Sequence, residues 1–96
     1  VIRFNAAADP EPYREIAVCL GVADPEAPGA DAAHALADRI DQLARDVGVP
    51  RGLSEIGVRE ENLSTLAKTA LLDACMSTNP RAADEAQMHA LFLAAM

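Results

Sequence analysis

Alanine is the commonest residue of this 96-residue chain, and it limits what the chain can fold into. The sequence holds 21 alanines but only two Phe, one Tyr and no Trp. Alanine has the highest helix propensity of all residues, yet its small side chain adds little to a hydrophobic core. The sequence therefore predicts an all-α protein with a thin core and little stability to spare at this length.

Apolar residues recur at helical spacing in four segments, approximately 12–20, 31–47, 60–76 and 84–95. The clearest pattern places Leu36, Ile40, Leu43 and Val47 on one stripe of the second segment. The short run "RGLSEIGV" suits a single helical turn. We therefore predict a small bundle of about four helices plus a short helical turn, forming a single helical domain or domain fragment over residues 1–96.

Capping residues indicate where these helices begin. Asp31 precedes an apolar stripe and is predicted to cap the second helix. Asp84 and Gln87 have the spacing of a capping box at the start of the last helix. The remainder of that helix, "MHALFLAAM", is apolar on nearly every side, so we expect it to be buried or docked against another surface.

The opening residues "VIRFN" resemble the tail of an element begun upstream, which predicts a fragment of a longer chain. The formal net charge is −7, so we expect no nucleic-acid partner, because an acidic surface repels phosphates. No apolar run approaches the ~20 residues that cross a bilayer, so no membrane partner is expected. Cys19 and Cys75 lie in apolar contexts, which favours reduced, buried thiols and a cytoplasmic location.

Two histidines each follow a carboxylate at helical spacing: His34 follows Asp31, and His89 follows Glu85. A metal needs three or four converging ligands, and neither pair is repeated. We therefore predict no metal ligands in this chain. The five glycines never approach the GxGxxG spacing, so no cofactor-binding residues are predicted either.

The stretch "CMSTNPR", residues 75–81, follows the third predicted helix. Pro80 cannot continue a helix and biases Asn79 toward an extended backbone. Ser77, Thr78 and Asn79 can bond the last helix carbonyls, and Arg81 is favoured near them. Cys75 near a helix C-terminus is not expected to be a nucleophile, since the dipole there disfavours a thiolate. No catalytic residue is predicted.

The segment "LAKTALLDACMSTNPR", followed by a short terminal helix, closely resembles the end of the iron-dependent alcohol dehydrogenases of group III. The pieces "VIRFN", "LADRIDQLARDVGVPRGLSEIGV" and "REENLSTLAKTAL" agree with that family in order. The resemblance implies the C-terminal part of the dehydroquinate-synthase-like helical domain. It also implies a parent enzyme that uses Fe²⁺, or Zn²⁺, and NAD(P). The implied metal ligands, one Asp and three His, belong to segments before Val1.

The resemblance implies roles for the loop alone. Cys75, Thr78 and Asn79 would line the substrate pocket, while Pro80 and Arg81 would shape the turn. The chain would then supply packing and one pocket wall to an alcohol/aldehyde oxidoreductase and be inactive alone. Its expected partner is the remainder of the parent dehydrogenase or a second subunit, and a homo-oligomer is a further expectation. The alternative is a stand-alone helical protein-interaction module that uses the Met88–Met96 face.

Overall fold

The computed structural model describes all residues from Val1 to Met96, and it contains helices and no strands. The all-α class predicted from the sequence is confirmed. The α-helices are α1 (Ile2–Ala6), α2 (Glu11–Cys19), α3 (Gly29–Asp46), α4 (Leu63–Leu71) and α5 (Glu85–Ala94), and the 3-10 turns are η1 (Leu53–Ile56), η2 (Glu60–Asn62) and η3 (Ala74–Thr78). None of the helices combines the length and apolar character needed to cross a membrane.

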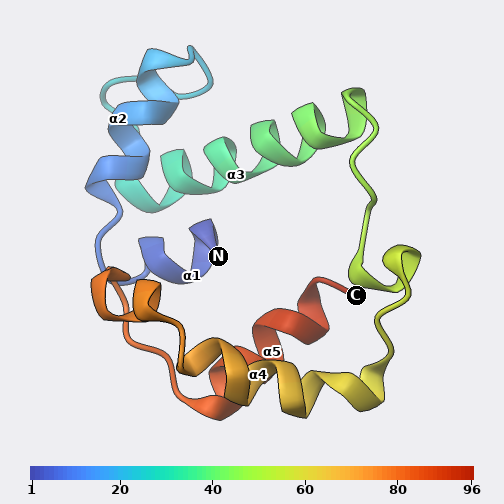
Figure 1. Cartoon of the computed structure of the whole chain (residues 1–96). Helices are drawn as coiled ribbons and strands as arrows, with labels where there is room; N and C mark the ends of the chain where they lie inside the picture. The colour runs from blue at the N-terminus through green and yellow to red at the C-terminus, as the bar shows by residue number, and fades with distance from the viewer. The chain divides into compact units, whose positions relative to one another are not determined.

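Two compact units make up the chain, residues 1–48 and residues 49–96. The expectation of a single domain over residues 1–96 stays a prediction. In the first unit α2 packs across the first half of α3, and α1 lies beside α3 (Figure 1). Ala17 of α2 meets Ala32 and Leu36 of α3 in a buried core. Small side chains let these two helices approach closely, but they bury little apolar area.

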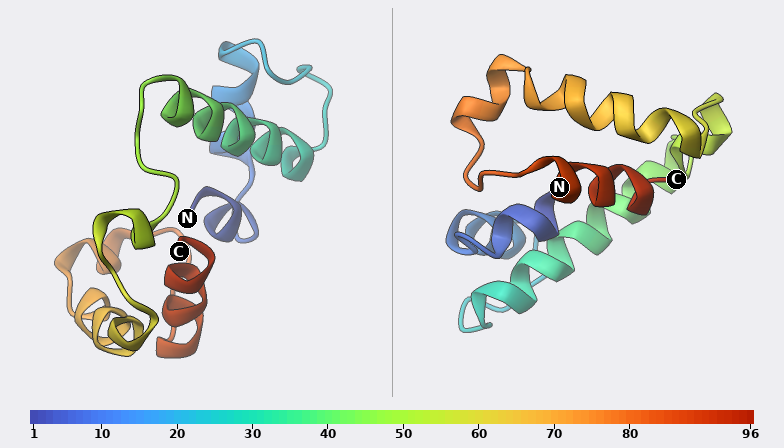
Figure 2. Two further views of the ribbon diagram at one scale, coloured as in Figure 1. Left: turned by 90° about the vertical axis from the view of Figure 1, so that its right-hand side faces the viewer. Right: turned by 90° about the horizontal axis from the view of Figure 1, so that it is seen from below.

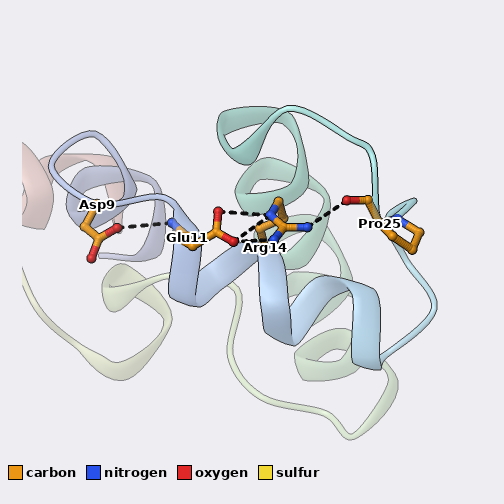
Figure 3. A network of polar contacts seen from close by, with 4 residues as sticks. All are labelled: Asp9, Glu11, Arg14 and Pro25. Atoms are coloured by element: carbon orange, nitrogen blue, oxygen red, sulfur yellow. Dashed lines mark hydrogen bonds and ion pairs between the residues drawn. The ribbon is translucent and has the colours of Figure 1, made fainter.

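Polar side chains at the surface tie the first unit together. The Arg14 guanidinium donates to the Glu11 carboxylate one turn earlier and, over 2.7 Å, to the carbonyl of Pro25 in the following loop (Figure 3). The hydrogen bond from Arg14 holds the pKa of Glu11 below its ordinary value. Arg3 of α1 bonds Asp38 of α3 at 2.5 Å. Exposed pairs of this kind contribute little to stability, because water and salt screen them.

Helix α3 begins two residues earlier than expected. Its N-cap is Pro28, with no capping side-chain bond, and Asp31 lies inside the first turn. The prediction that Asp31 caps this helix is therefore wrong. A carboxylate in the first turn still interacts favourably with the helix dipole. Of the predicted stripe only Leu36 is buried, while Ile40, Leu43 and Val47 are exposed.

In the second unit α4 and α5 run antiparallel side by side (Figure 2). Leu63 and Ala67 of α4 are fully buried, and Met88 of α5 is buried with them. The predicted capping box is confirmed, because the Asp84 side chain accepts from the Gln87 N–H at 2.8 Å and the Gln87 side chain accepts from the Asp84 N–H at 3.1 Å. The apolar last helix thus docks on α4 within its own unit.

The end of the chain returns to the turn η1. The Leu53 N–H donates to the Ala95 carbonyl at 2.8 Å, and the Ser54 hydroxyl donates to the Met96 main-chain oxygen at 2.6 Å. Gly52 makes this approach possible, since a Cβ there would lie 2.2 Å from the Met96 oxygen. The predicted single turn around Leu53 and Ile56 is therefore present, and it anchors the last residues of the chain.

The third predicted helix, over 60–76, is not continuous. The chain forms η2, then α4, and α4 ends at Leu71. Asp73 takes an extended backbone conformation with ψ of 133°, and the 3-10 turn η3 follows it. Because the apolar positions continue across this break, the periodicity alone predicts one long helix. An Asp that leaves the helical conformation and caps the next turn overrides that pattern.

Many large apolar side chains are exposed in both units. They are Val1, Ile16, Leu20, Ile40, Leu43, Val47, Val49, Ile56, Leu72 and Leu93. Leu72, at the break after α4, is 87% exposed.

Candidate functional site

The residues that follow α4 form a short, internally bonded loop, Asp73 to Arg81. The 3-10 turn η3 occupies its first part, from Ala74 to Thr78. The Met76 N–H donates to the Asp73 carbonyl at 3.0 Å, and the Asn79 N–H donates to the Met76 carbonyl at 3.4 Å. The loop is therefore held by its own main chain.

Asp73 opens this loop. Its carboxylate accepts a hydrogen bond from the Cys75 N–H at 2.7 Å. That bond is the first cause of the lowered pKa of Asp73, and a bond from the Cys75 thiol is the second. In turn, the bond to the Asp73 carboxylate and its negative charge raise the pKa of Cys75 above its ordinary value. The thiol is therefore neutral at pH ~7.

Cys75 lies at the start of η3 rather than near the end of a long helix. Both thiols, Cys19 and Cys75, are exposed, so the expectation that they are buried is wrong. For Cys75 the reason is the break at Asp73, which ends α4 before this residue, whereas Cys19 is the last residue of α2. The chemistry at Cys75 disfavours a nucleophile, because the nucleophilic form of cysteine is the thiolate.

The polar side chains of the loop bond the backbone: those of Ser77 and Thr78 reach carbonyls of the preceding turn, as the sequence suggested, and that of Asn79 reaches a carbonyl further along the chain. The Ser77 hydroxyl donates to the Ala74 carbonyl at 2.7 Å, and the Thr78 hydroxyl donates to the Cys75 carbonyl at 3.1 Å. The Asn79 side-chain amide donates to the Arg81 carbonyl at 2.6 Å. Asn79 itself has ψ of 133°, the extended conformation that a following Pro80 favours.

The two histidines lie apart from this loop in the chain. His34 is an exposed residue of α3, and His89 is a half-buried residue of α5. With Glu85 and Ala86, His89 lines a depression of about 460 Å³ that opens widely to solvent. Glu85 also forms an ion pair with Lys68 at 3.8 Å. Nowhere do three His, Cys, Asp or Glu side chains converge as a metal site requires.

Asp73 is the residue whose role the sequence reasoning missed. The segment "LLDACMSTNP" indicates this role, because an Asp side chain commonly accepts a hydrogen bond from the main-chain N–H two residues later, which forms an Asx turn. Leu72 is a second indication of the break, since it lies outside the apolar stripe at the point where α4 ends.

Fold and loop together define a helical segment that carries an ordered polar loop and no metal-binding cluster of its own. The model of the family described as "Fe-containing alcohol dehydrogenase family, C-terminal" matches residues 1–96. The chain belongs to the Fe-containing alcohol dehydrogenase family, of which it represents the C-terminal part. The family is named for iron, but the residues of this chain do not fit an iron site, because no ligand set converges.

Two relatives match most of the chain in sequence. The chain is 41% identical over 83 residues to lactaldehyde reductase of Escherichia coli K12, which covers 86% of this chain and 22% of that protein. It is 34% identical over 92 residues to 1,3-propanediol dehydrogenase of Klebsiella pneumoniae, covering 96% of this chain and 24% of that protein. The chain thus spans about a quarter of the length of these relatives.

Solved structures share the fold. A 1,3-propanediol oxidoreductase matches with a TM-score of 0.93 and 33% identity over 100% of this chain and 25% of that chain. An alcohol dehydrogenase from Oenococcus oeni matches with a TM-score of 0.91 and 31% identity over 98% of this chain and 24% of that chain. The C-terminal helical assignment made from the sequence is confirmed.

Proposed function

We propose that this chain is the C-terminal helical segment of an NAD(P)-dependent, iron-type alcohol dehydrogenase. In that enzyme it packs against the preceding domain and supplies one wall of the substrate pocket, formed by Cys75, Thr78 and Asn79. Pro80 and Arg81 hold the turn that presents them. The parent interconverts an alcohol and an aldehyde by hydride transfer, and the chain by itself is inactive.

The observation that carries this proposal is the ordered loop with an exposed thiol. The hydroxyls of Ser77 and Thr78 donate hydrogen bonds to main-chain carbonyls of the same loop. The hydroxyls therefore hold the turn, and the Cys75 side chain is left exposed at its surface. A rigid loop that presents a small, weakly polar group suits a pocket wall better than a catalytic centre.

The reaction centre lies in the remainder of the parent in this proposal. A metal bound there polarises the alcohol or carbonyl oxygen, and the nicotinamide accepts or donates hydride. The residues of this chain take no part in holding either group. Two exposed thiols and no disulfide are compatible with a reducing cytoplasm.

The expected partner is the remainder of the parent enzyme or a second subunit. The exposed apolar residues of α3, Ile40, Leu43 and Val47, continue the stripe whose first residue, Leu36, is buried under α2. Leaving such a stripe in water costs ~25 cal/mol per Å². A covering surface outside this chain would remove that cost.

A chimeric enzyme tests the pocket wall directly. The first three-quarters of the E. coli lactaldehyde reductase would be joined to this chain in place of its own matching quarter. We expect an active chimera, in which Cys75→Phe narrows the pocket and raises KM for longer alcohols more than for short ones. The matched control is Cys19→Phe, since Cys19 is also an exposed thiol but lies on α2.

Unchanged kinetics in Cys75→Phe would contradict the placement of this side chain at the substrate. An equal loss in Cys19→Phe would point instead to a general effect on folding.

The stand-alone interaction module is less well supported. Met88 is buried within the second unit, and Leu93 is the only large apolar side chain of α5 that is exposed. The Met88–Met96 face is therefore mostly used within the chain. Light scattering separates the two readings: a monodisperse monomer that melts cooperatively favours the module, and self-association favours a segment that lacks its neighbours.

A further inference from the structure

We propose that the second half of α3 is a docking surface for the segment that directly precedes Val1 in the parent enzyme. That segment continues α1 as a longer helix and packs an apolar side on Ile40, Leu43 and Val47. The inference rests on the proposed function, because it requires a parent chain before Val1. It goes further in naming which part of the parent covers this helix.

The uncovered surface is the second half of one apolar stripe of α3. Leu36, Ile40, Leu43 and Val47 follow one another at i, i+4, i+7 and i+11, so they share one side of the helix. Their exposure rises along the stripe, from 2% at Leu36 to 41%, 49% and 67% at the three residues that follow. The cover that α2 provides through Ala17 therefore stops near the middle of α3.

Contacts at the two ends of the N-terminal segment fix its direction along α3. Pro10, after α1, lies against Gly29 at the start of α3, where a Cβ would be 3.1 Å from the Pro10 side chain. Arg3, in the first turn of α1, bonds Asp38 at 2.5 Å and Asp41 at 3.4 Å, in the middle of α3. The chain from Arg3 to Pro10 therefore runs antiparallel to α3 (Figure 1). Followed backwards from Arg3, it points toward the end of α3.

Helix α1 is short and has no side-chain cap at its start. It has five residues, Ile2–Ala6, and Val1 at the N-cap position makes no capping side-chain bond. The Val1 carbonyl accepts the helical hydrogen bond from the Asn5 N–H at 2.9 Å. A single turn is only marginally stable by itself, so further turns before Val1 would stabilise α1. About two such turns would span the ~9 Å of α3 between Asp41 and Val47.

A second copy of this chain is the alternative occupant, and two features disfavour it. The formal net charge is −7, so two copies repel each other. The segment before Val1, in contrast, is joined to α1 and is held beside the stripe at a high effective concentration. The interface between α1 and α3 thus continues onto the exposed stripe without a separate partner.

Thiol labelling tests the proposal in this chain alone and in the chimera with the first three-quarters of the E. coli lactaldehyde reductase. Leu43→Cys places a thiol on the stripe in a Cys19→Ser, Cys75→Ser background. Its modification by N-ethylmaleimide is followed by peptide mass spectrometry. We expect labelling to be about tenfold or more slower in the chimera than in the chain alone, because a packed side chain reacts only during local opening.

Gln42→Cys is the matched control. Gln42 is the neighbouring residue of α3, exposed and outside the apolar stripe. Its labelling rate should differ little between the chain and the chimera.

Leu43→Asn provides a second measurement that needs no thiol. Leu43 is half-exposed in this chain, so the substitution should leave the urea midpoint of the chain nearly unchanged. In the chimera it should lower the midpoint, because there it places a polar group in a packed interface. An equal effect in the two proteins would contradict the docking surface.

Equal labelling rates of Leu43→Cys in the chain and in the chimera would overturn the proposal, and so would a slowing that Gln42→Cys shares. Protection that disappears when the chimera is diluted until its subunits separate would assign the stripe to a second copy and overturn it as well. The proposed function fails by a different result, unchanged kinetics in the Cys75→Phe chimera, which leaves the labelling of Leu43→Cys unaffected.

Discussion

Gly52 lies at a point where the backbone leaves no room for a side chain. A Cβ at this position would lie 2.2 Å from the Met96 oxygen and 2.6 Å from its carbonyl carbon. We predict that Gly52→Ala destabilises the second unit by ~1–3 kcal/mol, because the backbone around η1 must shift. Urea unfolding followed by circular dichroism measures the loss.

Gly29→Ala is the control for this prediction. Its Cβ would lie 3.1 Å from the Pro10 side chain and 3.9 Å from the Pro10 main-chain carbon, and Gly29 lies in the first turn of α3, where alanine favours the helix. We expect a much smaller change, or a gain. Equal effects of the two substitutions would contradict the close approach of the chain end to Gly52.

Asp73 and Cys75 predict how stability depends on pH. The lowered pKa of Asp73 stabilises the folded chain above pH ~4 and is lost as pH falls through the folded-state value. The raised pKa of Cys75 stabilises it below pH ~8.5 and is lost as pH rises through the folded-state value. The stability advantage of the wild type over Asp73→Asn should therefore be largest between these limits. Urea midpoints across pH check it, and a constant difference would contradict it.

At the scale of the helix, the two acidic residues predicted as caps behave differently. Asp84 caps α5 in a reciprocal box with Gln87, whereas Asp31 lies within the first turn of α3 without a capping bond. We predict that Asp84→Ala costs ~1 kcal/mol and Asp31→Ala only a few tenths, the dipole effect alone. Thermal unfolding of both variants measures the difference, and the reverse order would contradict these cap assignments.

Helix existence was predictable from the sequence, but the breaks between helices were less so. The segments around α2 and α3 were found because each carries an apolar stripe, and α5 was found from its capping box and the apolar run that follows it. The break at Asp73 was missed because apolar residues continue on both sides of it. Helix α1 was missed for a different reason: five residues, Ile2–Ala6, are too few for periodicity to register, and they pack on α3 instead.

At the scale of the whole molecule, the sequence predicted the class of protein better than the state of its side chains. The loop letters from Cys75 to Arg81 identified the family because they combine a thiol, an amide, a proline and an arginine at fixed spacing. Which side chains are buried could not be predicted from the sequence in the same way. Both cysteines and most of the α3 stripe are exposed here, since periodicity shows which residues share a face and not whether anything covers it.

We propose that this chain is the helical quarter of an iron-type alcohol dehydrogenase and that it holds neither metal nor nicotinamide. The most direct test is metal analysis of the purified chain after incubation with Fe²⁺ or Zn²⁺, together with an assay for alcohol-dependent reduction of NAD⁺ and NADP⁺. We predict no bound metal in stoichiometric amount and no reduced nicotinamide above background. One tightly held metal ion that is lost on substitution of His34 or His89, or turnover of an alcohol by the chain alone, would contradict the claim.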